Sequence, residues 1–408
     1  MKRMNTLWVL LLFFLGIGLW PQSSNPAGED FQIIYAPGEK YRITEISNFR
    51  QSVNNKYTGF ISRQIRGIME VTGRKNGQSE LSGTYYVMQE SKHDSRFIAN
   101  SISKTEPSRF VIASNGQFIV PEGVQYPLTR SFPVFPKDKL NPGDKWQAFG
   151  ERYVDPLNKG IFTRVQFYCD YQFMGEKEYE GVEAYLINAQ YALRYKGDDP
   201  KGDPKLKAIT NGGHKVEIYV SKNTGRPLFM RDLIIENLGG EVYLFTDNSQ
   251  MVLKGFTQTW FDLVEIMNRD KILEEIDTDI VKNIPDVTVE NSDQGVKLTL
   301  NNLRFVADQD ILLAGENSKL DQIAAALKKI PDRSFMVVGH TAYVGTEESM
   351  YDLSVKRAKK IVDMLVERGI DAKNFLYQGK GGSDPVALND TEENKAKNRR
   401  VEIIIMED

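Results

Sequence analysis

The sequence is poor in the residues that build disulfides and metal centres. It has one cysteine, Cys169, in 408 residues, so no intramolecular disulfide can form. Cys169 lies in a strand-like run of apolar and aromatic residues, where we expect a small buried side chain. A lipoprotein needs a cysteine directly after its leader, and none stands there. The chain is therefore not expected to be a lipoprotein.

Histidine is equally scarce. The three histidines, His93, His214 and His340, are far apart in the sequence, and none belongs to a His-Glu-x-x-His pattern. A lone cysteine without a histidine partner does not indicate a nucleophile. The Gly-Lys pair at residues 379–380 lacks the Walker spacing that precedes a phosphate loop. We therefore expect no enzyme, no metal site and no cofactor.

The charge balance argues against nucleic acid as a partner. The formal net charge is -3 and the isoelectric point is near 5.9. No run of lysine or arginine offers a positive surface for a polyanion. The class that remains is a folded protein with 41% hydrophobic and 26% charged residues.

The first residues have the pattern of a secretory signal peptide. Lys2 and Arg3 precede an apolar run at residues 7–20, after which the sequence turns polar at once. A helix of that run would be about 21 Å long, short of the roughly 30 Å hydrocarbon core of a bilayer. We predict a signal peptide over residues 1–24 and therefore an exported protein.

Residues 28–262 are typical of antiparallel β-structure. Short alternating runs are separated by turn signals such as Asn76-Gly77 and Asn115-Gly116. A proline-rich stretch at residues 132–144 suggests a boundary, which gives one β-rich domain over residues 28–138 and a second, or a continuation, over residues 139–262. The pattern favours an antiparallel sheet or sandwich in water. A transmembrane β-barrel is the alternative, although several runs do not sustain one clean apolar face.

The spacing of apolar residues changes twice after residue 262. Apolar residues recur at helical spacing over residues 263–285, which predicts a helical linker rich in charge. Residues 286–408 follow as strand, helix, strand, helix, strand, strand, which indicates a mixed α/β sheet of order βαβαββ. The sequence thus predicts a multidomain protein with a β-rich N-terminal region and an α/β C-terminal domain.

Several separated motifs in this last domain occur in a recognisable order. Gly339-His340-Thr341 ends a strand, Gly345 follows in the loop, Asp352-Leu353-Ser354-Val355-Lys356-Arg357-Ala358 lies on a helix, and Asn398-Arg399-Arg400-Val401 precedes the last strand. In these motifs, the stretch from Val287 to Asp408 resembles the OmpA C-terminal-like family of peptidoglycan-associating domains. The resemblance covers that stretch alone.

The resemblance implies a pocket that grips the diaminopimelate residue of a peptidoglycan stem peptide. In the family an arginine and an aspartate clamp the carboxylate and the amine, and the arginine corresponds to Arg357. A guanidinium matches a carboxylate in shape and charge. The family aspartate corresponds to Ala342 and the family asparagine to Met350. Loss of one charge-assisted hydrogen bond would weaken binding by about 1.5 to 3 kcal/mol, roughly tenfold to a hundredfold.

The remaining pocket residues that the resemblance implies are Thr341, Gly345, Asn398, Arg399 and Arg400. Asn398 is also expected to fix the turn before the last strand by bonding backbone groups. For Arg399 and Arg400, surface charge and packing between helix and strand are as well supported as contact with a ligand.

Together these features predict a periplasmic scaffold or anchor of the cell envelope, associated with the outer membrane. Its C-terminal domain would contact peptidoglycan, and its β-rich region would contact an envelope or outer-membrane protein or lipid. Two alternatives remain open. The C-terminal domain could be a protein-interaction module that no longer binds peptidoglycan, or the β-rich region could be an outer-membrane β-barrel with a periplasmic wall anchor.

Overall fold

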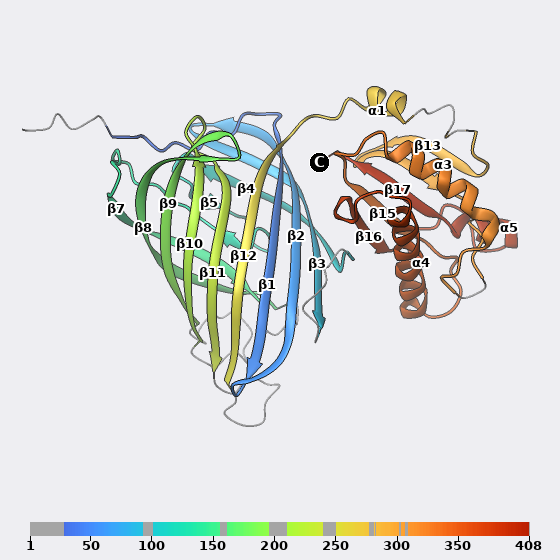
Figure 1. The fold of residues 1–408 in the computed structure, drawn as a ribbon, viewed down its shortest axis with the longest axis horizontal. Coiled ribbons are helices and arrows are strands. Elements are labelled where there is room, and N and C mark those ends of the chain that lie inside the picture. Colours follow the sequence, from blue (N-terminus) through green and yellow to red (C-terminus); the bar gives the residue numbers. More distant parts are fainter. Residues whose placement is uncertain are drawn as a thin grey trace, which may run out of the picture.

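The computed structural model describes residues 28–92, 101–155, 161–195, 210–239, 250–276, 281, 283–301, 303–306 and 309–407. The predicted signal peptide, residues 1–24, lies outside this part of the chain. Figure 1 shows a large curled sheet built by the N-terminal half and a smaller α/β domain beside it. Among the described residues, no helix has both the length and the apolar character needed to cross a membrane.

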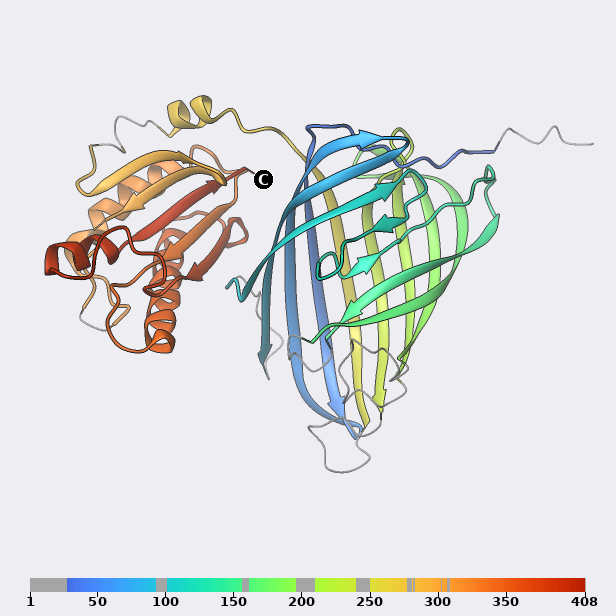
Figure 2. The same ribbon diagram turned by 180° about the vertical axis from the view of Figure 1, so that it is seen from behind.

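The N-terminal half forms one antiparallel sheet. Its strands are β1 (Lys40–Val53), β2 (Lys56–Lys75), β3 (Gln78–Lys92), β4 (Lys104–Ala113), β5 (Phe118–Ile119), β6 (Thr129–Arg130), β7 (Lys145–Val154), β8 (Thr163–Tyr179), β9 (Val182–Tyr195), β10 (Thr210–Ser221), β11 (Pro227–Gly239) and β12 (Gln250–Val264). Their order is β5-β4-β3-β2-β1-β12-β11-β10-β9-β8-β7-β6. The antiparallel sheet that the sequence predicts is confirmed, but the described strands form one curled sheet where a sandwich would have two (Figure 2).

Local turn chemistry explains the hairpins of this sheet. Asn76 and Gly77 have φ angles of 52° and 75° and join β2 to β3, where Lys75 pairs with Gln78. A two-residue hairpin turn of this kind needs positive φ at both positions, which Asn and Gly tolerate best. The sequence thus fixes this turn and the register of the two strands.

The inner face of the sheet is the core of this region. Along β8 every second residue is buried, including Phe167, Cys169 and Tyr171, whereas Gln166 and Asp170 between them are exposed. Burial of Cys169 agrees with the expectation from sequence. Apolar side chains therefore fill the inside of the curl, and mostly polar side chains cover its outside.

The C-terminal domain is a five-stranded mixed sheet with helices on one face. After α1 (Arg269–Glu275), its elements are β13 (Val287–Ser292), β14 (Gly295–Leu300), η1 (Ala314–Glu316), α3 (Asn317–Leu327), β15 (Phe335–Gly339), α4 (Glu347–Glu367), η2 (Ala372–Asn374), β16 (Phe375–Gly379), α5 (Glu392–Asn398) and β17 (Val401–Met406). The sheet order is β13-β14-β17-β15-β16, with only β15 and β16 parallel among the described pairs.

The predicted mixed α/β sheet is confirmed, but the order of its elements differs. A hairpin, β13 and β14, stands where the sequence predicts one strand, and the short helix α5 separates β16 from β17. Both additions are short, and segments of six or seven residues leave little periodic signal. Of the predicted linker over residues 263–285, α1 covers seven residues, and its Ile272 packs into the C-terminal core.

The other face of the C-terminal sheet packs against the outside of β3. A cluster of buried apolar residues joins the two units: Tyr86, Met88, Ile102, Met336, Val338, Leu376, Ile404 and Met406. We call it the junction cluster. At its edge the Ile102 N–H donates to the Tyr377 carbonyl at 2.7 Å, and Gln294 Nε2 donates to the Tyr86 hydroxyl at 2.9 Å.

Candidate functional site

The site begins where two strands end against a helix. A methyl group on Gly339, the last residue of β15, would lie 2.2 Å from the Ser354 carbonyl oxygen, and one on Gly379, the last residue of β16, would lie 2.2 Å from Ser354 Oγ. Only glycine permits this approach. The Ser354 hydroxyl accepts a hydrogen bond from Gly381 N–H at 2.9 Å. The buried face of α4 is thereby fixed beside the loop that follows β15.

Residues 340–345 form that loop, and each of its turns is anchored. Thr341 N–H donates to the Gly381 carbonyl at 2.9 Å, and Tyr343 N–H donates to Asn389 Oδ1 at 2.9 Å. Gly345 has a φ of 96°, a left-handed conformation that favours glycine. Thr346 then caps α4, because its hydroxyl accepts from Ser349 N–H at 3.2 Å. These contacts fix the backbone conformation of the loop.

Two residues that the sequence analysis named for the pocket, Ala342 and Met350, are buried in the packing of this loop. Ala342 is 6% exposed and Met350 is 3% exposed. The Met350 sulfur accepts a hydrogen bond from Val344 N–H at 3.2 Å. Thr341 Oγ1 is buried and has no hydrogen-bond partner among the described residues. Ala342 and Met350 therefore place apolar groups in the packing of the loop.

Arg357 lies one turn beyond Ser354 on the same buried face of α4. Its side chain is 8% exposed. Its Nε donates to the Gln309 carbonyl at 3.2 Å, and its guanidinium carbon lies 4.8 Å from the centre of the Phe305 ring. These contacts place Arg357 against the segment before α3. The planar guanidinium is in a setting of low polarity, which strengthens any pairing it makes with a carboxylate.

Asn398 organises the segment that faces the loop. Its Oδ1 accepts from Val386 N–H at 2.8 Å and from Ala387 N–H at 3.0 Å, and its Nδ2 donates to Asn389 Oδ1 at 3.2 Å. Since Asn389 also accepts from Tyr343 N–H, the two asparagines link the segment before α5 to the loop after β15. Sequence reasoning named Asn398 but did not give Asn389 this linking role, because only the folded chain brings the two segments together.

Arg399 and Arg400 point into different surroundings. Arg399 is partly exposed, and its guanidinium lies 3.5 Å from a carboxylate oxygen of Glu392 on α5. Arg400 is buried, and its Nε donates to Glu402 Oε1 at 2.8 Å. Burial alone would raise the pKa of the Glu402 carboxyl, but His340, whose Nε2 lies 3.6 Å from that carboxylate, and the charge of Arg400 outweigh it and lower that pKa to about 2. Arg400 thus takes part in a buried ion pair.

Comparison with known proteins identifies this domain. Residues 304–399 match the model of the OmpA family, and this range includes every site residue except Arg400. The C-terminal domain belongs to the OmpA family. The strand ends, the buried arginine on α4 and the Asn398 turn described above all fall within this domain.

The chain is similar to several proteins of known name. The chain is 38% identical over 102 residues to Outer membrane protein A of Bordetella avium, covering 25% of this chain and 53% of that protein. It is 30% identical over 160 residues to Peptidoglycan-binding protein ArfA of Mycobacterium tuberculosis, covering 39% and 48% respectively. The chain spans about half the length of these relatives. A solved outer membrane protein of Borrelia burgdorferi B31 is 34% identical, with 29% of this chain and 96% of that chain covered and a TM-score of 0.26.

Proposed function

We propose that the chain is an exported, non-enzymatic scaffold of the cell envelope, whose C-terminal domain contacts peptidoglycan in the periplasm. The observation that carries the proposal is that an OmpA-family domain, of a kind whose relatives include a peptidoglycan-binding protein, keeps an arginine at position 357 on the buried face of α4. Arg357 supplies the planar donor that recognises a carboxylate of the stem peptide.

The rest of the proposed pocket has changed its chemistry. The Ala342 side chain has no acceptor, and the sulfur of Met350, a weak acceptor, already accepts from Val344 N–H, so neither replaces the oxygens of aspartate and asparagine. The proposed contact is therefore weaker than that of a complete clamp by about 1.5 to 3 kcal/mol. Thr341, Gly345, Asn398 and Arg399 contribute by shaping the loop and its rim, and Arg400 by holding β17 in place through Glu402.

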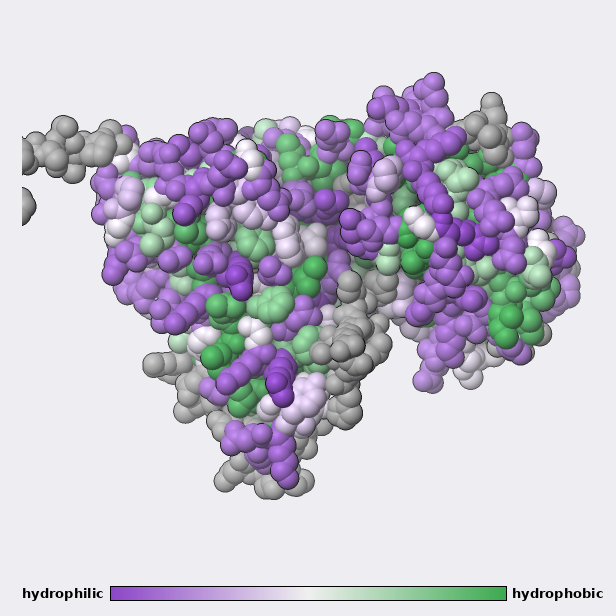
Figure 3. Space-filling model, in the orientation of Figure 1, coloured by the Kyte–Doolittle hydropathy of each residue, from purple (hydrophilic) through white to green (hydrophobic). Residues whose placement is uncertain are grey.

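The N-terminal sheet is proposed to contact an envelope partner, either an outer-membrane protein or lipid. Its outer face carries a row of partly exposed aromatic residues across four strands: Tyr179, Tyr219, Phe229 and Trp260. Leu233 and Ile235 on β11 are half exposed on the same face. Figure 3 shows apolar patches among hydrophilic residues on the sheet. Aromatic residues of this kind are enriched at protein interfaces.

A second candidate function rests on the apolar filling of the loop. Because Met350 and Ala342 pack beneath residues 343–345, the loop presents Tyr343 and Val344 to solvent. An exposed aromatic and aliphatic pair suits contact with another protein better than contact with a charged stem peptide. In this case the domain is a protein-interaction module that no longer binds peptidoglycan.

Sedimentation of the full chain with purified peptidoglycan separates the two candidates. We expect binding to peptidoglycan that contains diaminopimelate, a loss of at least tenfold in Arg357→Ala, and a gain of about tenfold to a hundredfold in Ala342→Asp. Arg368→Ala is the matched control, since Arg368 caps the far end of α4, where it pairs with Asp321 outside the proposed site. Far-UV circular dichroism confirms that each variant is folded.

The outcomes are distinct. Equal binding by the native chain and Arg357→Ala would overturn the role of Arg357. No binding by the native chain, to peptidoglycan with diaminopimelate or with lysine at the stem position, would favour the interaction module. Restoration of binding by Ala342→Asp alone would then identify the missing carboxylate as the cause.

A further inference from the structure

The curled N-terminal sheet encloses a cavity of about 170 Å³. Apolar side chains from strands on several sides of the curl form most of its wall, among them Ile65, Leu81, Phe110, Val216 and Met230. A dry cavity of about 150 Å³ with a similar lining is large enough to bind benzene. The volume therefore suits the apolar body of one small molecule.

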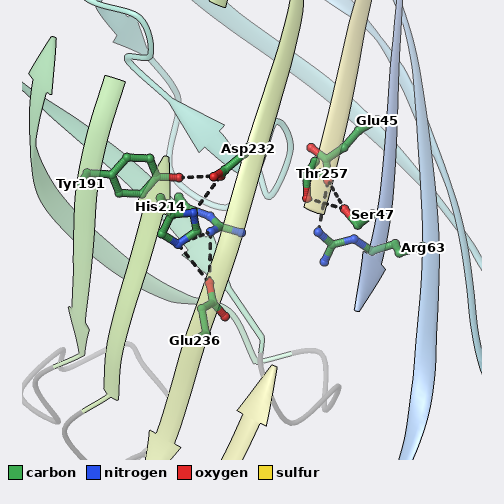
Figure 4. Close-up of polar contacts among 9 residues, drawn as sticks. Glu45, Ser47, Arg63, Tyr191, His214, Asp232, Glu236 and Thr257 are labelled. Carbon is green, nitrogen blue, oxygen red and sulfur yellow. Dashed lines mark hydrogen bonds and ion pairs between the residues drawn. The ribbon is translucent and has the colours of Figure 1, made fainter. Parts of the chain in front are cut away.

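One part of the wall is charged. Asp232 Oδ2 accepts from the Tyr191 hydroxyl at 3.2 Å and lies 2.7 Å from His214 Nδ1. His214 Nε2 lies 3.3 Å from Glu236 Oε1, and the Tyr191 ring stacks on the imidazole at 4.2 Å. Figure 4 shows Tyr191 and His214 both directed at Asp232, with Glu236 on the far side of His214. The network fixes Asp232 in one orientation.

The arginines of this wall already have carboxylate partners. Arg63 lies 3.1 Å from Glu45, and Arg152 lies 3.3 Å from Glu236. Arg226, also on the lining, lies 3.0 Å from Glu39. Among the described residues, these three arginines and His214 face four carboxylates, so positive charge is not in excess. An anionic ligand would find a carboxylate already beside each of the three guanidinium groups.

Asp232 has hydrogen-bonding capacity left over. Its second oxygen, Oδ1, is buried and has no hydrogen-bond partner in the part of the chain that the structure describes, and the same holds for the hydroxyl of Tyr85. Both residues line the cavity. A buried carboxylate oxygen without a donor is costly, and such oxygens are uncommon outside sites that receive a ligand. Asp232 Oδ1 therefore lacks a hydrogen-bond donor, whereas Arg63 Nε on the same lining is buried without an acceptor among the described residues.

One end of the cavity lies at the end of β12. Thr259, Phe261 and Leu263 follow one another on the same face of β12 and all line the cavity. Leu263, the outermost of the three, is 57% exposed. The space therefore extends toward the end of the sheet where β12 leaves it.

We infer that this cavity binds one small amphipathic molecule whose apolar body fills the space and whose hydroxyl or protonated amine donates a hydrogen bond to Asp232 Oδ1. The ligand class is a neutral or cationic amphiphile. We expect the same body with a carboxylate head to bind more weakly, because Arg63, Arg152 and Arg226 already have carboxylate partners.

The test compares three probes that share a six-carbon chain: 1-hexanol, hexylamine and hexanoate. Isothermal titration calorimetry of the full chain should detect binding of the alcohol and the amine, and binding of hexanoate at least tenfold weaker. Asp232→Asn should weaken hexylamine binding at least tenfold. Asp170→Asn is the matched control, because Asp170 is exposed on the outer face of β8, where it accepts from Gln147, and should bind as the native chain does.

A second variant keeps the test decisive if Asp232→Asn fails to fold. Val216→Phe places a larger side chain in the cavity and should abolish binding of all three probes while near-UV circular dichroism reports a folded sheet. Binding that survives Val216→Phe, equal binding of the three head groups, or no binding of alcohol and amine to the native chain would each overturn the inference. None of these outcomes involves peptidoglycan, so the proposed function is tested separately.

Discussion

The sulfur of Met350 lies 3.2 Å from the backbone nitrogen of Val344 and accepts a hydrogen bond from its N–H. A side chain of α4 thus fixes the loop after β15. Met350→Ala removes both the hydrogen bond and the buried side chain. We expect the free energy of unfolding to fall by about 2 to 5 kcal/mol. Met350→Leu keeps the volume and should cost less than about 1.5 kcal/mol. Urea unfolding measures both, and equal losses in the two variants would contradict this view of the loop.

The buried pair of Arg400 and Glu402 predicts an acid-sensitive C-terminal domain. The pKa of Glu402 is about 2 in the folded chain, below its ordinary value of 4.5. A carboxyl group with a lowered pKa stabilises the fold fully above pH 4.5, and this contribution disappears as the pH falls toward 2. The loss is on the order of 3 kcal/mol.

Hydrogen exchange of the β17 amides at pH 5 and pH 2.5 measures this loss. Glu402→Gln should be less stable at neutral pH, because Arg400 loses its partner, and should show a smaller change between the two pH values. Glu393→Gln is the control, since Glu393 is an exposed residue of α5 paired with Lys397. An unchanged pH response in Glu402→Gln would show that other groups carry it.

The N-terminal sheet should respond to pH in the opposite direction. Burial lowers the pKa of His214, but hydrogen bonds to Asp232 and Glu236 outweigh burial and raise that pKa above its ordinary 6.5. A histidine with a raised pKa stabilises the fold fully below pH 6.5, and the contribution is lost as the pH rises through the folded pKa. The free energy of unfolding of the sheet should therefore fall as the pH rises above about 6.5.

Tryptophan fluorescence reports this change selectively, because Trp146 and Trp260 lie in the sheet and residues 265–408 contain no tryptophan. His214→Gln should be less stable near pH 6 and should lose the pH dependence in this range. His340→Gln, in the other domain, should keep it. A slope that persists unchanged in His214→Gln would assign the effect elsewhere.

The junction cluster predicts that the two units are docked. Met88 is fully buried between them. Met88→Asp places a charge there, so we expect the units to separate while each stays folded. Small-angle scattering should show a larger radius of gyration, and trypsin should cut residues 265–286 faster. Ile119→Asp, the same kind of change at an exposed position, should alter neither; a native-like radius for Met88→Asp would count against docking.

Local patterns predicted the local features of this fold well. Asn76-Gly77 and Asn115-Gly116 give turns, and the alternation around Cys169 gives the inner face of β8. What local patterns could not give is which strands pair across long stretches of chain. The pairing of β1 with β12 depends on residues distant in sequence, and this pairing unites the region as one sheet.

Of the two sites, only the C-terminal one carries sequence motifs, and only its motif residues could be predicted. The order of motifs from Gly339 to Arg400 located the C-terminal loop, but not the burial of Met350 or the link through Asn389. The network at His214 carries no motif. Its one sequence signal lies in β11, where Asp232 and Glu236 share the inward face with Met230 and Ile234. Two acidic residues thus occupy positions at which the alternation of the strand predicts apolar side chains.

The pairing of β1 with β12 also sets the timing of assembly. Arg42 and Asp262 are hydrogen-bonded across this ladder although they stand 220 positions apart. Until residues 250–264 have been synthesised and have paired with β1, that strand has an open edge and the cavity lacks the wall that β12 provides. Contacts between such distant segments form slowly, and an uncovered strand edge invites pairing with other chains. The final strand thus acts as the closing step of the sheet, and the interval before it arrives is when the chain is most exposed to aggregation.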